Sequence, residues 1–300
     1  MQYLITGGTG FIGRRLTESL LADGHKVMLV SRDPERAKLQ FSSRVDAIML
    51  SDVSLLPNIT IDAVVNLAGA PIADRRWTSA RKALLKRSRI DFTKELIQRL
   101  RESNQRPAAF ISGSAIGYFG PHDDAAPLSE NGTVQEGFQH TLCKQWEDVA
   151  LSAEKELGAR VCCVRTGVVF GKRGGALAKM LPAFKLGLGG PMGSGDQWMS
   201  WIHVEDEVGI IRFLLDNDQL SGPFNATAPE AVMNMTFTQA LAKTLNRPAF
   251  FRVPAALLKL VMGESSELLL SGQHVYPTAL VAQGYIFSFP DLRSALRASV

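Results

Sequence analysis

One short stretch of the chain concentrates reactive side chains. Residues 138–150, FQHTLCKQWEDVA, place His140, Cys143 and Lys144 within about one turn of an expected helix. Three chemistries suit these residue types: acid–base catalysis by the imidazole, nucleophilic attack by the thiol, and metal binding. The remaining histidines are scattered without ligand spacing, so the sequence disfavours a metal site. The other two chemistries depend on which helix face packs on the fold.

The helical phase of this stretch separates the reactive side chains. A nearly apolar stripe, spaced by three or four residues, runs through Gln139, Cys143, Trp146, Ala150, Ala153 and Leu157. The stripe through His140 and Lys144 is mostly polar. The phase therefore predicts that Gln139 and Cys143 face the interior, whereas His140 and Lys144 face solvent. Without a placed base, Cys143 is expected to be a packing residue rather than a nucleophile.

The elements around this helix alternate between strand-like and helix-like stretches. Apolar runs predict strands at 2–6, 25–30, 62–69, 108–113 and 159–167. Helical patterns cover 11–24, 78–103, 138–157 and 204–216. Such alternation predicts an α/β fold, a doubly wound parallel Rossmann sheet with helices on both faces.

The second half of the chain changes character. Eight glycines and two prolines between 171 and 195 predict long loops rather than core. We therefore assign 1–170 and about 202–228 to a Rossmann domain that binds the cofactor. Residues 171–201 and 229–300 are assigned to a smaller C-terminal substrate lobe.

Composition restricts the class of protein. The chain has 300 residues, is 46% hydrophobic and carries a net charge of +4. It shows neither a charged leader nor an 18-residue apolar span, which predicts a cytoplasmic protein without a membrane contact. The adjacent Cys162 and Cys163 are expected in the core. Residues 75–106 hold eleven Lys and Arg against three acids, but no nucleic-acid motif accompanies them, so no nucleic-acid partner is predicted.

The amino-terminal TGGTGFIG predicts a dinucleotide site. Gly7, Gly10 and Gly13 follow a strand and open a helix, with Phe11 and Ile12 in the same turn. Glycine permits the tight turn and lets backbone approach the pyrophosphate, whose charge then lies at a helix N-terminus.

The residues after the second strand predict which dinucleotide binds. A site for NAD places an acid there to bind the ribose 2′-hydroxyl, whereas this chain has Ser31 and Arg32. A guanidinium pairs with the 2′-phosphate of NADP, so we predict NADP(H) as the cofactor. The alternative is that Arg32 is a surface cation and Asp33 binds the ribose.

Arg89 is a second cation with two interpretations. It shares a helical stripe with Leu85, Phe92 and Leu96, and a charge on an apolar stripe needs a partner. One interpretation is that it binds a cofactor phosphate or ribose. The other is that it extends to the helix edge and into water.

Four motifs, in order, carry a resemblance. TGGTGFIG, NLAGAPI at 66–72, ISGSAIGYFG at 111–120 and RTGVVFG at 165–171 resemble the extended short-chain dehydrogenase/reductases, in their NAD-dependent epimerase/dehydratase branch. The later LGLGGPMGSGDQWMSWIHVEDEVG, and the segment from VPAALLKLVMGESSELLL to the end, are similar to the YfcH-type epimerase family proteins with their characteristic C-terminal domain. The resemblance spans essentially the whole chain and implies a Rossmann core, bound NADP(H) and a substrate lobe.

The resemblance also assigns residues. It implies that Leu67, Ala68 and Gly69 pass beside the adenine and ribose, and that Val169 lies near the nicotinamide. Ser114 stands in the place of the catalytic serine, whose hydroxyl binds a substrate carbonyl or alcohol. Tyr118, four residues later, is the second candidate catalytic residue, at a family-like position that is usually structural.

The chain departs from the family it resembles at the two usual catalytic positions. These enzymes normally use Tyr-x-x-x-Lys, in which the tyrosine transfers a proton and the lysine holds the nicotinamide ribose. The helical phase puts Gln139 and Cys143 in these two positions, with Glu147 as the acid that follows. Two functions stay open: an oxidoreductase or epimerase acting on a carbonyl or sugar-nucleotide-like molecule, and a non-catalytic NADPH sensor or partner-binding protein. Related folds also suggest a homodimer.

Overall fold

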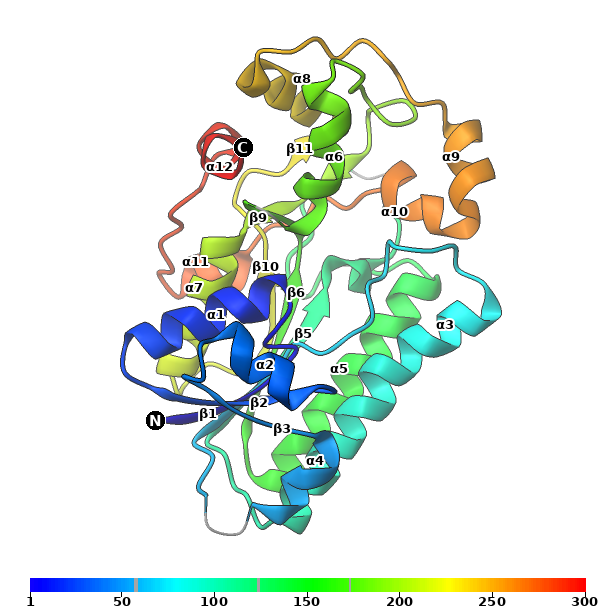
Figure 1. Ribbon diagram of the computed structural model, residues 1–300. Helices are drawn as coiled ribbons and strands as arrows, with labels where there is room; N and C mark the ends of the chain where they lie inside the picture. The colour runs from blue at the N-terminus through cyan, green and yellow to red at the C-terminus, as the bar shows by residue number, and fades with distance from the viewer. Residues whose placement is uncertain (57–58, 123–124, 173) are drawn as a thin grey trace.

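The centre of the molecule is a parallel sheet. The computed structural model describes residues 1–56, 59–122, 125–172 and 174–300. In this part of the chain seven strands pair in the order β10-β6-β5-β4-β1-β2-β3, all parallel (Figure 1). Their bounds are β1 Gln2–Thr6, β2 Lys26–Val30, β3 Asp46–Ile48, β4 Ala63–Asn66, β5 Ala109–Ala115, β6 Arg160–Thr166 and β10 Gly222–Ala226. The order reverses between β1 and β4, which confirms the predicted doubly wound sheet.

Helices cover both faces of the sheet. One face packs on α1 (Phe11–Ala22), α2 (Pro34–Gln40) and α7 (Val204–Asp216), which bury Leu16, Ala37 and Ile211. The other packs on α4 (Phe92–Glu102) and α5 (Phe138–Leu157), together with the 3-10 turn η1 (Leu50–Leu55). Cys162 and Cys163 are buried on opposite faces, as expected of core residues.

The predicted helix over 78–103 is interrupted. It consists of α3 (Ser79–Lys86), a π-helical turn η2 (Arg87–Asp91) and α4. Single π turns inside α-helices are frequent at functional sites because they displace side chains from the regular helical position. The centre of this turn is Arg89.

A second core gathers later residues. Phe170, Leu177, Trp201, Phe237 and Leu296 belong to one buried cluster, and Figure 1 shows this lobe in the upper half of the molecule. Its elements are β7 Val168–Phe170, α6 Gly175–Lys185, β8 Trp198–Met199, β9 Trp201–His203, β11 Val232–Met233, α8 Asn234–Leu245 and α12 Leu292–Ser299.

The prediction of long loops over 171–195 is wrong for its first half. Helix α6 forms there and buries Leu177 and Phe184 in the second core. The apolar residues of this stretch recur at helical spacing, and the glycines lie at its ends rather than inside it. Counting glycines without their positions therefore misread a helix as loop.

The carboxyl-terminal segment returns to the Rossmann domain in two places. It runs through α9 (Ala255–Met262), the turn η4 (Gly263–Ser266), α10 (Glu267–Leu270) and α11 (Thr278–Ala282) before α12. Leu268 of α10 packs beside Trp77 and Leu142, and Leu280 of α11 enters the main sheet core. The segment assigned from sequence to the lobe thus contacts both parts of the molecule.

Candidate cofactor and active site

The sheet brings the predicted site residues to one edge. Gly7 follows β1, Ser31 follows β2, Leu67 follows β4, Ser114 lies near the end of β5 and Val169 follows β6. Because these strands are parallel, all five positions lie at their carboxyl ends, where open α/β sheets bind ligands near the reversal of strand order.

The glycine loop is shaped so that side chains cannot replace glycine. Gly7 has φ +68°, and a Cβ there would lie 2.6 Å from the Leu67 carbonyl oxygen. A Cβ on Gly13 would lie 2.3 Å from the Gly7 carbonyl oxygen. Gly10 precedes α1, which has no side-chain cap and no acid in its first turn. The N-terminal N–H groups of α1 are therefore suited to bind an anionic group.

The two apolar residues of the loop have separate packing partners. A Cβ on Gly174 would lie 2.1 Å from the Phe11 ring, and one on Gly171 would lie 2.9 Å from it. These glycines leave room for the Phe11 ring against the glycine loop. Ile12 packs partly buried on the main core.

Arg32 and Asp33, the two candidate ligands of the cofactor's 2′ position, differ in their contacts. Asp33 accepts a hydrogen bond from the Arg36 backbone N–H at 3.0 Å and so caps α2. The Ser31 hydroxyl donates to the Asp33 carbonyl oxygen at 3.0 Å. The Arg32 side chain is exposed, which leaves its guanidinium available to a phosphate.

A buried polar chain fixes the turn after β4 beside the glycine loop. The Ala68 N–H donates to the Thr6 hydroxyl at 3.1 Å, and that hydroxyl donates to Asn66 at 2.7 Å. Asn66 donates in turn to Thr93 at 2.8 Å, and Thr93 also accepts from Trp146 at 3.1 Å. The turn that holds Leu67, Ala68 and Gly69 is thereby tied to both α4 and α5.

Arg89 lies beside this turn and has no anionic partner in the part of the chain that the structure describes. Its guanidinium carbon is 3.0 Å from where a Gly69 Cβ would be and 5.2 Å from the centre of the Trp146 ring. Burial lowers the pKa of Arg89 from its ordinary value, and among the described residues no carboxylate pairs with it. Arginine remains charged even so. A half-buried guanidinium without a counter-charge favours the phosphate or ribose interpretation over extension into water.

The phase prediction for α5 holds for three of its four residues. Gln139 and Cys143 are 6% and 5% exposed and pack on Gly117, whose added Cβ would lie 3.1 Å from Gln139 Oε1 and 3.7 Å from Cys143 Sγ. Burial raises the pKa of the Cys143 thiol to about 12, so it is a neutral packing group. Lys144 is exposed and pairs with Asp148 at 2.7 Å.

The prediction that His140 faces solvent is wrong. The turn η3 (Ile116–Phe119) covers it, so that His140 is buried with its Nδ1 hydrogen-bonded to the Tyr118 carbonyl oxygen. The Tyr118 ring also meets the imidazole edge to face, with 5.4 Å between ring centres. The helical pattern could not anticipate this cover because η3 precedes α5 by some twenty residues.

Ser114 belongs to a buried ionic network. Its hydroxyl donates to Glu147 at 2.6 Å, and Glu147 accepts two further hydrogen bonds from Arg165, both at 2.9 Å. Arg165 also lies 3.4 Å from the centre of the Tyr118 ring. The single Ser114 proton is thus engaged, which leaves this hydroxyl able to accept a hydrogen bond from a substrate alcohol. Its predicted catalytic role stays a prediction, and Tyr118 has structural contacts.

Sequence reasoning missed a residue that joins this site from the C-terminal segment. Gln139 Nε2 donates to Glu267 Oε1 at 2.9 Å. The two residues are 128 positions apart, and no local pattern signals their contact. It also missed Glu207 of α7, which is fully buried and accepts a hydrogen bond from Thr166 at 2.7 Å. Burial raises the pKa of Glu207 to about 8.

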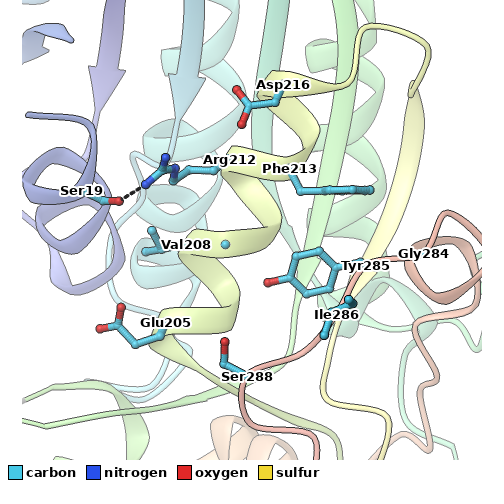
Figure 2. A pocket seen from close by; sticks show the side chains of 11 residues that line it. Ser19, Glu205, Val208, Arg212, Phe213, Asp216, Gly284, Tyr285, Ile286 and Ser288 are labelled. Atoms are coloured by element: carbon cyan, nitrogen blue, oxygen red, sulfur yellow. Dashed lines mark hydrogen bonds between the residues drawn. The ribbon is translucent and has the colours of Figure 1, made fainter. Parts of the chain in front are cut away.

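Other candidate features lie elsewhere or are not found in the described residues. A surface pocket of about 560 Å³ lies between α1, α7 and residues 284–288. Arg212, which lines it, donates to Ser19 at 2.6 Å, and Figure 2 shows how the lining side chains lie. No predicted site residue lines it. Across the described ranges, no group of three or more His, Cys, Asp or Glu side chains could hold a metal ion. Nor does any helix in that part of the chain have the length and apolarity to cross a membrane.

Comparisons with known proteins find two matching family models and a similar full-length relative. Residues 3–227 match the model of the NAD dependent epimerase/dehydratase family, and residues 253–299 match a domain of unknown function, DUF1731. Epimerase family protein SDR39U1 of Mus musculus is 40% identical over 306 residues, covering 99% of each chain.

Two solved structures extend the comparison. A crystal structure of human epimerase family protein SDR39U1 with NADPH has a TM-score of 0.90 at 36% identity, covering 100% of this chain and 99% of that one. A nucleoside-diphosphate sugar epimerase from Corynebacterium glutamicum has a TM-score of 0.77 at 30% identity, covering 100% of this chain and 58% of that one. The chain belongs to the NAD dependent epimerase/dehydratase family.

Proposed function

We propose that this protein binds NADP(H) and uses it as an oxidoreductase or epimerase on a carbonyl or sugar-nucleotide-like small molecule. The observation that carries the proposal is Arg89, a half-buried cation beside the turn at Gly69 that has no anionic partner among the described residues. The exposed Arg32 and the uncapped α1 give two more positions for the phosphates of one dinucleotide. The human relative crystallised with NADPH supports the same cofactor.

Different residues of the chain would bind different parts of the cofactor. The glycine loop and α1 would bind the pyrophosphate, Arg32 the 2′-phosphate, and the turn at Leu67 the adenosine side. Val169 would lie toward the nicotinamide. Bound NADP(H) supplies the hydride, and the protein orients it and controls the accompanying proton. Ser114 would accept a hydrogen bond from a substrate alcohol, since its own proton is donated to Glu147.

A second candidate function, NADPH binding without turnover, is supported by the two residues of α5 that replace the usual tyrosine and lysine. Gln139 cannot donate a proton at neutral pH, and burial raises the pKa of the Cys143 thiol to about 12. If no other group transfers protons, the protein would hold NADPH without consuming it and would act as a sensor or partner-binding protein. The predicted cytoplasmic location and homodimer stay predictions under either function.

The test is oxidation of NADPH, followed by its absorbance, across a panel of carbonyl compounds and sugar nucleotides. We expect turnover with at least one class, and we expect Ser114→Ala to reduce it at least tenfold. Turnover that is insensitive to Ser114→Ala would remove this residue from the mechanism but keep the enzyme. Tight NADPH binding without turnover on any compound would favour the sensor.

A further inference from the structure

A carboxylate lies beside the position where a proton donor is missing. Glu267 begins α10, and its Oε1 accepts the hydrogen bond from the buried Gln139 side chain at 2.9 Å. Its second carboxylate oxygen makes no hydrogen bond to any described residue. Glu267 is only partly buried, so this oxygen can exchange protons with water. Gln139 itself lies against Gly117, just beyond the carboxyl end of β5, at the sheet edge that binds ligands.

The segment that carries Glu267 is fixed in place. Leu268, the next residue, packs into the cluster formed by Trp77, Leu85 and Leu142. Arg76 donates to the carbonyl oxygens of Val261 and, through its second nitrogen, of Leu260. Figure 1 shows α10 between the lobe and the α3 and α5 side of the Rossmann domain. The contact between Gln139 and Glu267 is therefore held by the fold on both sides.

We propose that Glu267 is the proton-transfer group of the active site and that Gln139 is the positioning residue that orients it. This inference rests on the proposed function. In the direction of reduction, the O–H bond of the Glu267 carboxyl breaks as the substrate oxygen gains its proton. Bound NADPH would supply the hydride that the carbonyl carbon needs in order to become the carbon of an alcohol. Glu267, which is only partly buried, would then take up a proton from the solvent, so that the overall reduction consumes one solvent proton.

A proton-transfer role for Glu267 would give a function to the contact between the C-terminal segment and α5. A proton donor must reach the reacting oxygen directly or through one water. Residues 253–299 match a separate domain model, and within that segment Glu267 accepts a hydrogen bond from Gln139 of α5. The substrate class that fits is a secondary alcohol, or the carbonyl compound formed from it. The alcohol could donate a hydrogen bond to Ser114, whose own proton is donated to Glu147, and the carbonyl oxygen would take its proton from Glu267.

The experiment compares Glu267→Gln with Glu264→Gln. Glu264 lies three residues earlier and forms an exposed pair with Lys82, so its loss removes a carboxylate from the same segment at little cost. General acid–base groups contribute about 10²- to 10⁴-fold. We expect Glu267→Gln to lower kcat at least ~100-fold, to flatten the pH profile of kcat and to leave NADPH affinity unchanged. Glu267→Asp should retain the pH dependence at a reduced rate.

A second measurement does not need turnover. Carbodiimide labelling of carboxylates, read by mass spectrometry with and without NADPH, should show that NADPH protects Glu267 severalfold and leaves Glu264 unchanged. Equal labelling of Glu267 in both states would overturn its placement at the site.

The outcomes separate the two proposals. Turnover that survives Glu267→Gln within about threefold, against the 10²-fold contribution of an acid or base, would refute the proton-transfer role and leave the proposed function intact. If Glu267→Gln lowers both the free energy of unfolding and NADPH affinity but leaves the pH profile of kcat unchanged, Glu267 has only a structural role in holding the C-terminal segment against α5. No turnover by the unmodified protein would contradict the proposed function and the proton-transfer role with it, even if NADPH still protects Glu267.

Discussion

The cofactor side and the catalytic side of this site are built in different ways. Part of the proposed cofactor side comes from consecutive elements, since Gly7 and Gly13 lie in the first β-α-β unit and Arg32 follows its second strand. The proposed catalytic side takes Ser114, Gln139 and Glu267 from three distant elements. The first relies on backbone shape and a helix terminus, whereas the second relies on hydrogen bonds from Ser114 and Gln139 to carboxylates. The difference implies that variants of the catalytic side should change stability or proton transfer without changing cofactor affinity.

The largest expected effect is on stability, from the ion pair of Arg165 and Glu147. Their side chains are 3% and 8% exposed, and removing one partner of a buried pair typically costs about 3–5 kcal/mol because a charge is left unpaired. We expect Arg165→Met to lower the free energy of unfolding by about that amount, measured by urea denaturation. NADPH affinity of the folded protein should not change.

The matched control for this pair is the double variant Arg165→Met with Glu147→Leu. It removes both charges and should recover most of the lost stability. If instead Arg165→Met weakened NADPH binding tenfold while leaving stability intact, the proposed separation between the two sides would be wrong.

An effect that is smaller per pH unit is expected from the titration of Glu207. Burial raises the pKa of this carboxyl from its ordinary 4.5 to about 8, so the folded protein holds a proton that the unfolded chain has already lost. Unfolding then releases a proton between about pH 4.5 and pH 8, and stability falls with rising pH across that window by at most ~1.4 kcal/mol per pH unit. Above pH 8 this contribution becomes constant.

Glu207→Gln should remove this pH dependence. The variant keeps an acceptor for the Thr166 hydroxyl but cannot ionise, so its stability curve between pH 5 and pH 8 should be flatter than that of the unmodified protein. Thermal or urea unfolding at several pH values measures it. Parallel curves for the two proteins would show that Glu207 does not titrate in this range.

Sequence reasoning succeeded for the inward face of α5, because the burial of Gln139 and Cys143 follows from helical spacing. The cofactor-binding roles of the glycine loop and of Arg32 also follow from local spacing, and they stay predictions. It failed for His140, because η3 covers it from outside the helix. It also failed for α6, because glycines at the ends of a helix resemble a loop in composition.

The polar contacts across the site needed the fold itself. The pairs of Glu147 with Arg165 and of Gln139 with Glu267 join residues 18 and 128 positions apart. Single residues of these kinds give no periodic signal, and only the sheet order and the docking of Leu268 bring them together. The cofactor could therefore be predicted from the sequence, whereas the candidate proton donor could not.

The most direct test of the cofactor assignment is calorimetric measurement of NADPH and NADH affinity for the unmodified protein, Arg32→Ala and Arg89→Met. A charged hydrogen bond is worth about 1.5–3 kcal/mol, so NADPH should bind the unmodified protein roughly 10- to 150-fold more tightly than NADH. Arg32→Ala should erase most of that preference, whereas Arg89→Met should weaken both cofactors by a similar factor. Equal affinities of the unmodified protein for NADPH and NADH would contradict the account.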